Sequence, residues 1–306
     1  MFYRLTLLEN GADNMATALS ERLNRHNKLT DPTLQYSNLA RQPGLQAHQW
    51  YWQSSHDQSG LRQQVSQLLR EAQSKGSLDW AWQQQLQPQI DWRLAVFDMD
   101  STLVQTEVMN QLADAVGIGE QVATITSQCM TGELDFQQGF RQRLSLLAGF
   151  PIAELEAIYN SIEFMPGAER LMRNLLARGI YCVIISGGFD YFADRFALHL
   201  GMQEAYANPM EQQQGRLTGY ASVPILDAQR KLEILEQLTQ QQSLQTCQTI
   251  AVGDGANDLP MLLGAGLGIA FHAKPLVQQQ ARHRINQFGL DALLYVMGYS
   301  DDVLLD

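Results

Sequence analysis

Strand-length apolar runs alternate with amphipathic helical segments along the chain from Trp92 onward. One run ends at Asp98, and three more lie at residues 179–186, 249–254 and 266–271. Continuously apolar strands that are separated by helices are typical of a parallel sheet with helices on both of its faces. This part of the chain therefore predicts an α/β fold built on a parallel sheet.

The connection between the first two of these strands is far longer than a crossover helix requires. Residues 105–160 have a helical pattern throughout. We therefore expect a Rossmann-like core at residues 93–300, into which a helical cap is inserted at residues 105–160.

The first 85 residues carry a different pattern. The expected order is strand, helix, two strands joined by a turn at Pro43 and Gly44, helix and strand. This βαββαβ order is that of the ferredoxin-like arrangement, and by element order alone it resembles the small regulatory domains called ACT domains. A packing or dimerisation domain fits the same order. We expect a small α+β domain at residues 1–85, followed by a short linker at residues 85–91.

Trp50, Trp52, Trp80 and Trp82 fall on the expected strands of this N-terminal unit. Tryptophans in such positions build either the core of a small domain or the interface of a homodimer. The sequence is compatible with both.

The balance of charges excludes two classes of partner. The formal net charge is −11, so a nucleic-acid binder or a membrane-surface binder is not expected, because both partners are themselves negative. No run approaches the ~18 apolar residues of a membrane span. The three cysteines lack the pairing of a disulfide framework or a zinc site. We expect a cytoplasmic protein in which an anionic substrate would need a locally cationic pocket.

Acidic residues follow two of the predicted strands. Asp98 and Asp100 stand in VFDMDSTL, and Asp254 and Asp258 stand in VGDGANDLP. Ligands of open α/β sheets bind beyond the carboxyl ends of the strands, so these four acids are expected to converge on one crevice. Carboxylates that close together repel one another unless a cation or a shared proton intervenes. Because hard oxygen ligands suit Mg²⁺, the sequence predicts a magnesium site.

Four further residues offer groups that suit a phosphate. Ser186 has a hydroxyl, and Gly187 and its neighbour have flexible backbone N–H groups at the expected start of a helix. Lys231 lies at the start of an amphipathic helix. A metal together with a lysine would neutralise the oxygens of a transferring phosphoryl group.

Each of these features has an ordinary structural interpretation when it is taken alone. A D-x-D pair is common in solvated turns, a Ser-Gly-Gly run is more often a plain turn, and a lysine on an amphipathic helix is usually on the surface. The order of all four features along the chain favours the catalytic interpretation.

In that order, DMDST, SGG, Lys231 and GDGAND resemble the four motifs of the haloacid dehalogenase superfamily phosphatases. The resemblance implies that Asp98 is the nucleophile, which becomes an aspartyl phosphate, and that Asp100 is the general acid and base. It also implies that Mg²⁺ is held by Asp98, by the backbone carbonyl of Asp100 and by Asp254.

The same resemblance assigns the remaining residues of these motifs. Ser186, Gly187, Lys231 and Asn257 would bind the phosphate. Asp258 would orient Lys231 or a metal-bound water.

Within this superfamily the sequence is most similar to the phosphoserine phosphatases, on the basis of DMDSTLVQTE and of GELDFQQGFRQRLSLL. This similarity implies that Glu107 faces the substrate ammonium group and that Arg143 pairs with the substrate carboxylate. It also implies that Met130 and Phe136 close over the bound amino acid and exclude water.

Without the resemblance, Glu107 would be interpreted as an acid in the first turn of a helix and Arg143 as a solvated cap residue. Arg141 is a second candidate for the substrate carboxylate.

The expected function is therefore a magnesium-dependent phosphatase that hydrolyses O-phosphoserine to serine and phosphate, the last step of serine biosynthesis. Two alternatives stay open. One is the same chemistry on another small phosphomonoester, and the other is a non-catalytic regulatory protein that senses an amino acid.

Overall fold

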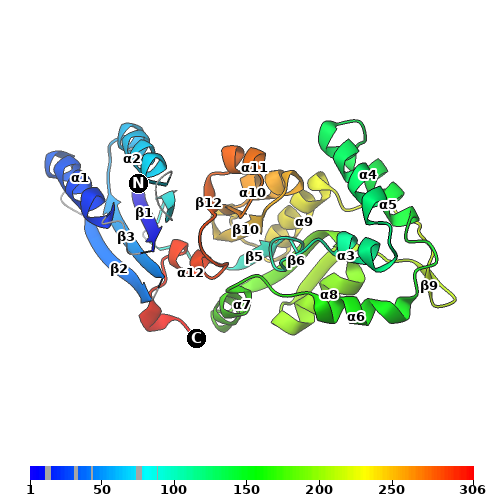
Figure 1. Ribbon diagram of the computed structural model, residues 1–306. Coiled ribbons are helices and arrows are strands. Elements are labelled where there is room, and N and C mark those ends of the chain that lie inside the picture. The colour runs from blue at the N-terminus through cyan, green and yellow to red at the C-terminus, as the bar shows by residue number, and fades with distance from the viewer. Residues whose placement is uncertain (11–14, 31–33, 43, 74–77, 88) are drawn as a thin grey trace.

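A computed structural model describes residues 1–10, 15–30, 34–42, 44–73, 78–87 and 89–306. Within these ranges, ten strands form one mixed sheet in the order β2-β3-β1-β4-β12-β11-β10-β5-β6-β7. The sheet runs through the length of the molecule, with the N-terminal unit at one end and the helices that follow β5, where the cap is expected, at the other (Figure 1). The expected α/β class is confirmed.

The N-terminal unit contains the expected six elements in the expected order. They are β1 (Phe2–Glu9), α1 (Met15–Thr30), β2 (Gln35–Gln42), β3 (Leu45–Gln53), α2 (Ser59–Gln73) and β4 (Leu78–Gln85). Strand β1 pairs antiparallel with both β3 and β4, which is the ferredoxin-like arrangement. Gly44 has a φ of +82°, as a tight turn requires, whereas the expected turn residue Pro43 lies outside the described residues.

The buried tryptophans of this unit build its core. Trp50, Trp52 and Trp82 are almost fully buried against Leu61 and Val65 of helix α2. The rings of Trp52 and Trp82 meet edge to face, with centroids 5.2 Å apart. Of the two roles considered for these three residues, the structure shows the core role.

The parallel part of the sheet carries the motifs. Its strands are β5 (Leu94–Phe97), β6 (Tyr181–Phe189), β7 (Glu204–Asn208), β10 (Thr249–Gly253), β11 (Leu267–Phe271) and β12 (His283–Ile285). Successive residues of β5 enter different cores, because Ala95 and Phe97 pack on one face of the sheet and Leu94 and Val96 on the other. Burial on both faces explains the unbroken apolar run in the sequence.

Helices cover both faces of this part of the sheet (Figure 1). One face carries α9 (Ala228–Gln241), α10 (Leu259–Gly264) and α11 (Pro275–Gln280), and the other carries α7 (Ala168–Ala177), α8 (Asp190–Leu200) and α12 (Ala292–Val296). Short 3-10 turns are η2 (Thr246–Gln248), η3 (Ala256–Asp258) and η4 (Asp301–Val303). The motif strands β5, β6 and β10 are adjacent at the centre of this arrangement.

The segment between β5 and β6 contains the expected run of helices. These are α3 (Val108–Ala115), α4 (Gly119–Thr131), α5 (Phe136–Ser145), the turn η1 (Ile152–Glu154) and α6 (Leu155–Ser161). A small hairpin of β8 (Gln212–Gln213) and β9 (Arg216–Leu217) lies beside them, through a bridge between Pro151 and Arg216. The sequence did not predict this hairpin.

The two parts of the sheet meet where β4 pairs antiparallel with β12. The carboxylate of Asp79, which is fully buried, accepts backbone N–H groups of Asn286 at 2.8 Å and Gln287 at 2.7 Å. The sequence predicted a linker between two units but not this continuous sheet.

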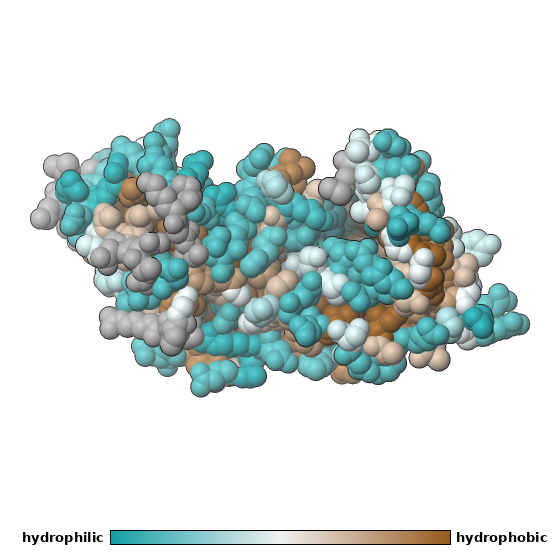
Figure 2. Space-filling model, in the orientation of Figure 1, coloured by the Kyte–Doolittle hydropathy of each residue, from teal (hydrophilic) through white to brown (hydrophobic). Residues whose placement is uncertain are grey.

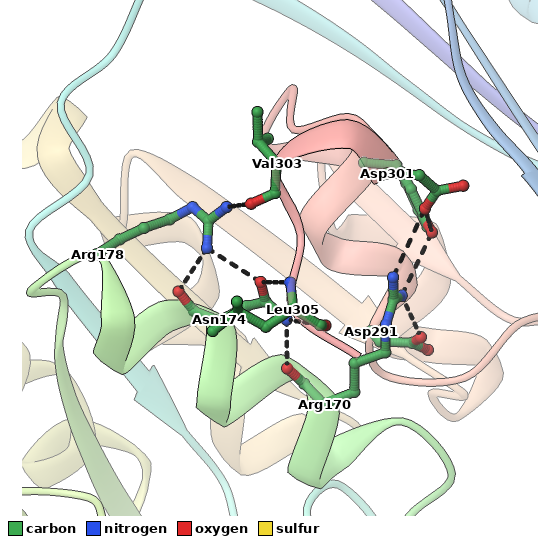
Figure 3. A network of polar contacts seen from close by, with 8 residues as sticks. Arg170, Asn174, Arg178, Asp291, Asp301, Val303 and Leu305 are labelled. Atoms are coloured by element: carbon green, nitrogen blue, oxygen red, sulfur yellow. Dashed lines mark hydrogen bonds and ion pairs between the residues drawn. The ribbon is translucent and has the colours of Figure 1, made fainter.

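The C-terminal segment is fastened to helix α7 (Figure 3). Arg170 pairs with Asp291 at 2.9 Å and with Asp301 at 3.6 Å. The Asn174 side chain donates to the backbone carbonyl of Leu305 and accepts from its N–H group, both at 2.8 Å. Arg178 donates to the carbonyl of Val303.

This segment also contacts the N-terminal unit, because the Arg4 guanidinium donates to the carbonyl of Met297 at 3.0 Å.

On the face in Figure 2, hydrophilic residues cover most of the surface, and hydrophobic residues gather mainly over the cap-bearing half. No helix in the described ranges is long and apolar enough to cross a bilayer.

Candidate active site

Asp98 stands directly after β5, at the centre of the parallel sheet. Its backbone N–H donates to the carbonyl of Val252 at 2.9 Å, so the pairing with β10 continues to this residue. Its Oδ1 accepts the N–H of Met99 at 2.8 Å. The side chain is nearly buried. The sheet therefore holds this carboxylate in a fixed place at the carboxyl end of its central strand.

Lys231 joins two of the motif acids. Its ammonium lies 2.8 Å from Asp98 Oδ1 and 2.6 Å from Asp258 Oδ1, and the lysine is fully buried. Burial alone would lower the pKa of Lys231, but Asp258 and Asp98 outweigh burial and raise it above its ordinary value. The amine is therefore held as an ammonium ion within the site.

Asp98, Asp254 and Asp258 offer carboxylate oxygens that all lie within 4.8 Å of one another. Burial and the charge of Asp258 raise the pKa of Asp98 well above its ordinary value and that of Asp254 to about 7. Such shifts are the mark of carboxylates that are crowded without enough positive charge. An all-oxygen set of this kind fits a hard divalent cation such as Mg²⁺.

Asp100 lies on the cap side of Asp98. Its Oδ1 accepts the N–H of Val108, the first residue of α3, at 2.8 Å. Burial, followed by the charge of Glu107, raises the pKa of Asp100 to about 7. A carboxyl group whose pKa lies near neutrality is suited to give and take a proton.

Ser186, Gly187 and Gly188 form the end of β6. The pairing of β6 with β7 is irregular between Ile185 and Phe189, so these three residues leave the regular sheet. The expected helix start therefore comes slightly later, because α8 begins only at Asp190. The Ser186 Oγ is buried and accepts the N–H of Gly188 at 2.9 Å.

At Gly188 the backbone at the end of β6 comes close to the side chain of Asp100. A Cβ atom at Gly188 would lie 2.8 Å from Asp100 Oδ2 and 3.1 Å from Ser186 Oγ. A side chain there would displace both groups. This end of β6 and Asp100 therefore border the same small space.

The segment after β10 supplies the last motif residues. Asp258 is fully buried, and its Oδ2 accepts the N–H of Gly255 at 2.9 Å. Asn257 is half-buried beside it, with its Nδ2 at 3.5 Å from Asp258 Oδ1. Lys274 approaches Asp254 to 3.8 Å from the solvent side.

The cap residues that were predicted from the sequence take different places. Phe136 reaches the C-terminal end of β6, because a Cβ at Gly187 would lie 3.2 Å from its ring. Glu107 accepts a hydrogen bond from the hydroxyl of Ser101, a residue of the DMDST motif, at 3.1 Å. The side chain of Met130 lies outside the described part of the structure.

The two candidate arginines differ in their surroundings. Arg143 is half-buried and donates to the carbonyl of Gly139 at 3.3 Å and to Thr126 Oγ1 at 3.4 Å. Within the described ranges it forms no ion pair with a carboxylate. Arg141 is exposed and donates to Gln137 Oε1 at 3.3 Å. In the part of the chain that the structure describes, neither arginine forms an ion pair, so the two differ in burial: Arg143 is half-buried and Arg141 is exposed.

Three polar residues near the site were not predicted from the sequence. They are Gln137 in the cap, Asn208 at the end of β7 and Asp227 before α9. Asp227 carries a recognisable signal, because an aspartate just before an amphipathic helix is a common N-cap. Gln137 and Asn208 belong to no motif, and only the folded chain brings them to the site.

Known proteins are similar to this chain in sequence and in fold. The family model of haloacid dehalogenase-like hydrolases matches residues 95–263. The phosphoserine phosphatase of Archaeoglobus fulgidus is 40% identical over 230 residues, which cover 75% of this chain and 67% of that protein.

Solved structures extend the comparison. A hydrolase of this family from Salmonella enterica serovar Typhi is 30% identical, has a TM-score of 0.83, and is matched over 97% of this chain and 98% of its own. A phosphoserine phosphatase described as a phospho-aspartyl intermediate analogue is 38% identical, has a TM-score of 0.63, and covers 67% of this chain and 98% of its own. The chain belongs to the haloacid dehalogenase-like hydrolase family.

Proposed function

We propose that this protein is a magnesium-dependent phosphoserine phosphatase, which hydrolyses O-phosphoserine to serine and phosphate as the last step of serine biosynthesis. The observation that carries the proposal is the buried ammonium of Lys231 between Asp98 and Asp258, beside Asp254. Relatives and solved structures that bear the name phosphoserine phosphatase support the choice of substrate.

The charges of this group favour a divalent cation. Three carboxylates and one ammonium leave an excess of two negative charges, which one Mg²⁺ ion would balance. Asp98, Asp254 and the backbone carbonyl of Asp100 would hold it. When bound, the ion supplies positive charge that stabilises a transferring phosphoryl group.

In the proposed first step, a carboxylate oxygen of Asp98 attacks phosphorus and the bond from phosphorus to the serine oxygen breaks. Asp100 donates its proton to that oxygen, so serine leaves as a neutral alcohol. Lys231, Ser186, Gly187 and Asn257 would hold the phosphoryl oxygens throughout.

In the second step, Asp100 takes a proton from water as that water attacks phosphorus. The bond between Asp98 and phosphorus breaks, phosphate leaves, and both acids return to their starting states. Lys231 stays protonated, because its pKa is raised by the carboxylates around it.

Selection of the substrate would come from the cap. We propose that Arg143 pairs with the substrate carboxylate, that Glu107 faces its ammonium group, and that Phe136 and Met130 cover it. The half-buried position of Arg143 and the position of Phe136 over Gly187 support this assignment.

We also propose residues 1–85 and 93–300 as two domains, the second with its cap at 105–160, in a cytoplasmic protein that forms a homodimer. Sedimentation of the full-length chain tests the oligomeric state. A monomer at micromolar concentration would contradict the dimer.

Turnover of a substrate panel tests the function. Phosphoserine should be hydrolysed much faster than phosphothreonine, phosphoethanolamine and sugar phosphates in the presence of magnesium. Comparable rates over the panel would support a different phosphomonoester as substrate, and absence of any turnover would support the non-catalytic alternative.

A further inference from the structure

A side-chain hydrogen bond connects the cap helix α5 to the core. The Nε2 of Gln137 donates to Asp227 Oδ2 at 2.9 Å, across 90 residues of sequence. The other oxygen of Asp227 accepts the N–H of Arg230 at 3.1 Å and so caps helix α9. One carboxylate therefore serves both its own helix and the cap.

Asp227 is also tied to the phosphate-binding lysine. The backbone N–H of Lys231 donates to the carbonyl of Asp227 at 3.0 Å in the first turn of α9. A shift of Asp227 would therefore tilt the turn that carries Lys231.

A second connection runs from the same segment to the C-terminal end of β6. The N–H of Leu226 donates to Asn208 Oδ1 at 2.7 Å, and Asn208 Nδ2 donates to the carbonyl of Gly187 at 2.9 Å. Asn208 is nearly buried and uses both ends of its amide group. Buried polar side chains with every group satisfied are rigid positioning elements.

Phe136, the residue beside Gln137, contacts the same end of β6 that Asn208 holds. Phe136 packs on Gly187, and its ring stacks on Phe140, whose ring contacts Phe189 at the end of β6. The cap helix therefore meets the C-terminal end of β6 directly through Phe136 and indirectly through Gln137, Asp227 and Asn208.

We propose that the hydrogen bond between Gln137 and Asp227 is a latch that holds the cap helix α5 in position over the phosphate site. Gln137 and Asp227 are positioning residues, because their described side-chain hydrogen bonds join them to each other, to Arg141 and to the N–H of Arg230. The proposal rests on the proposed function for its kinetic effects. The latch strengthens substrate retention, so its loss should raise KM while the chemical step keeps its rate.

An exchange of the two functional groups tests the latch. In Gln137→Glu the new carboxylate keeps the acceptor for Arg141 but faces Asp227 without a donor. KM for phosphoserine should rise roughly tenfold, with kcat changed by less than about threefold, because a hydrogen bond to a charged group is replaced by repulsion.

The matching variant is Asp227→Asn, since asparagine still caps a helix. In the double variant Gln137→Glu with Asp227→Asn, the amide of residue 227 donates to the carboxylate of residue 137. KM should return to within about threefold of the parent value, because the charge-assisted hydrogen bond is restored. A merely structural role would not predict this rescue.

Gln142→Glu is the matched control, because Gln142 lies exposed on the same helix and its side chain has no hydrogen bond in the described structure. Its KM should equal that of the parent. Unchanged KM in Gln137→Glu, or a double variant no better than the single one, would overturn the latch.

Amide hydrogen exchange separates failure of the latch from failure of the proposed function. Peptides covering α5 should exchange faster in Gln137→Glu than in the parent or in Gln142→Glu, whichever phosphomonoester is the substrate. If the parent fails to hydrolyse phosphoserine but α5 exchanges faster, only the substrate assignment falls. If α5 exchange is unchanged, the latch is wrong.

Discussion

The ammonium of Lys231 lies 2.8 Å from the carboxylate of Asp98, in a place where both side chains are almost completely removed from water. A buried ion pair is costly to form unless further partners share the charge. Here Asp258 supplies such a partner at 2.6 Å. The buried group of charges is therefore suited to bind an anionic group together with a cation.

Replacement of Lys231 by Met should remove activity and lower stability. Catalysis should fall by roughly 10²–10³-fold, because a buried positive group no longer meets the phosphoryl oxygens. Unfolding free energy should fall by about 3–5 kcal/mol, because the buried carboxylates lose their partner. Urea titration and steady-state kinetics measure both quantities. Lys274→Met, at an exposed position, should change each far less, and equal losses in the two variants would contradict the central place of Lys231.

Stabilisation by magnesium should increase with pH. Because the pKa of Asp254 is raised to about 7 in the folded, metal-free protein, the folded state binds a proton that the unfolded chain has already released. The contribution of Asp254 to stability is therefore present below its unfolded pKa and is lost as pH rises through about 7.

Magnesium competes with that proton, so its effect on the melting temperature should be larger at about pH 8 than at about pH 5. Thermal melts at several pH values, with and without the ion, check this. In Asp254→Asn, magnesium should raise the melting temperature less, and this rise should change less with pH. A magnesium effect that is equal at both pH values would contradict the assignment.

Loss of the Arg143 guanidinium should change substrate preference. Arg143→Ala should raise KM for phosphoserine by roughly 10–100-fold, because a charge-assisted pair with the substrate carboxylate is lost. Phosphoethanolamine lacks that carboxylate, so its KM should be nearly unchanged. Parallel kinetics on both compounds measure the difference. Arg141→Ala should leave the preference intact. If Arg141→Ala loses the preference and Arg143→Ala keeps it, then Arg141 and not Arg143 binds the substrate carboxylate.

Asp79 should hold the two parts of the sheet together. Asp79→Ala leaves the N–H groups of Asn286 and Gln287 without their acceptor, which should cost about 2–5 kcal/mol. Asp79→Asn keeps an acceptor oxygen and should cost much less. Urea unfolding followed by tryptophan fluorescence and by circular dichroism should give separate transitions only for the alanine variant. Coincident transitions of unchanged midpoint would show that the junction does not depend on Asp79.

Much of the fold could be predicted because its signals are local. The core strands are long apolar runs, and the N-terminal strands alternate, so both follow from residue periodicity. Strand β12 has only three residues, and beside its pairing with β4 Asp79 accepts a hydrogen bond from the N–H of Asn286, which is 207 residues away. No local pattern contains that contact.

The residues of the candidate site also differ in whether the sequence alone reveals them. Asp98, Asp100 and Asp254 could be singled out because acids at the ends of apolar strands conflict with burial. Lys231 was found through its place in the order of motifs, although a lysine on an amphipathic helix would ordinarily be exposed. Gln137 could not be found, because its partner Asp227 becomes a neighbour only when the cap folds onto the core.

Covalent transfer of the phosphoryl group to Asp98 is the central step of the proposed mechanism. Acid quenching during turnover of phosphoserine with magnesium, followed by borohydride reduction and peptide mapping, tests it directly, because borohydride converts an aspartyl phosphate to homoserine. We predict homoserine at position 98, dependent on both phosphoserine and magnesium. Active enzyme that yields no homoserine, or yields it at another position, would contradict the account.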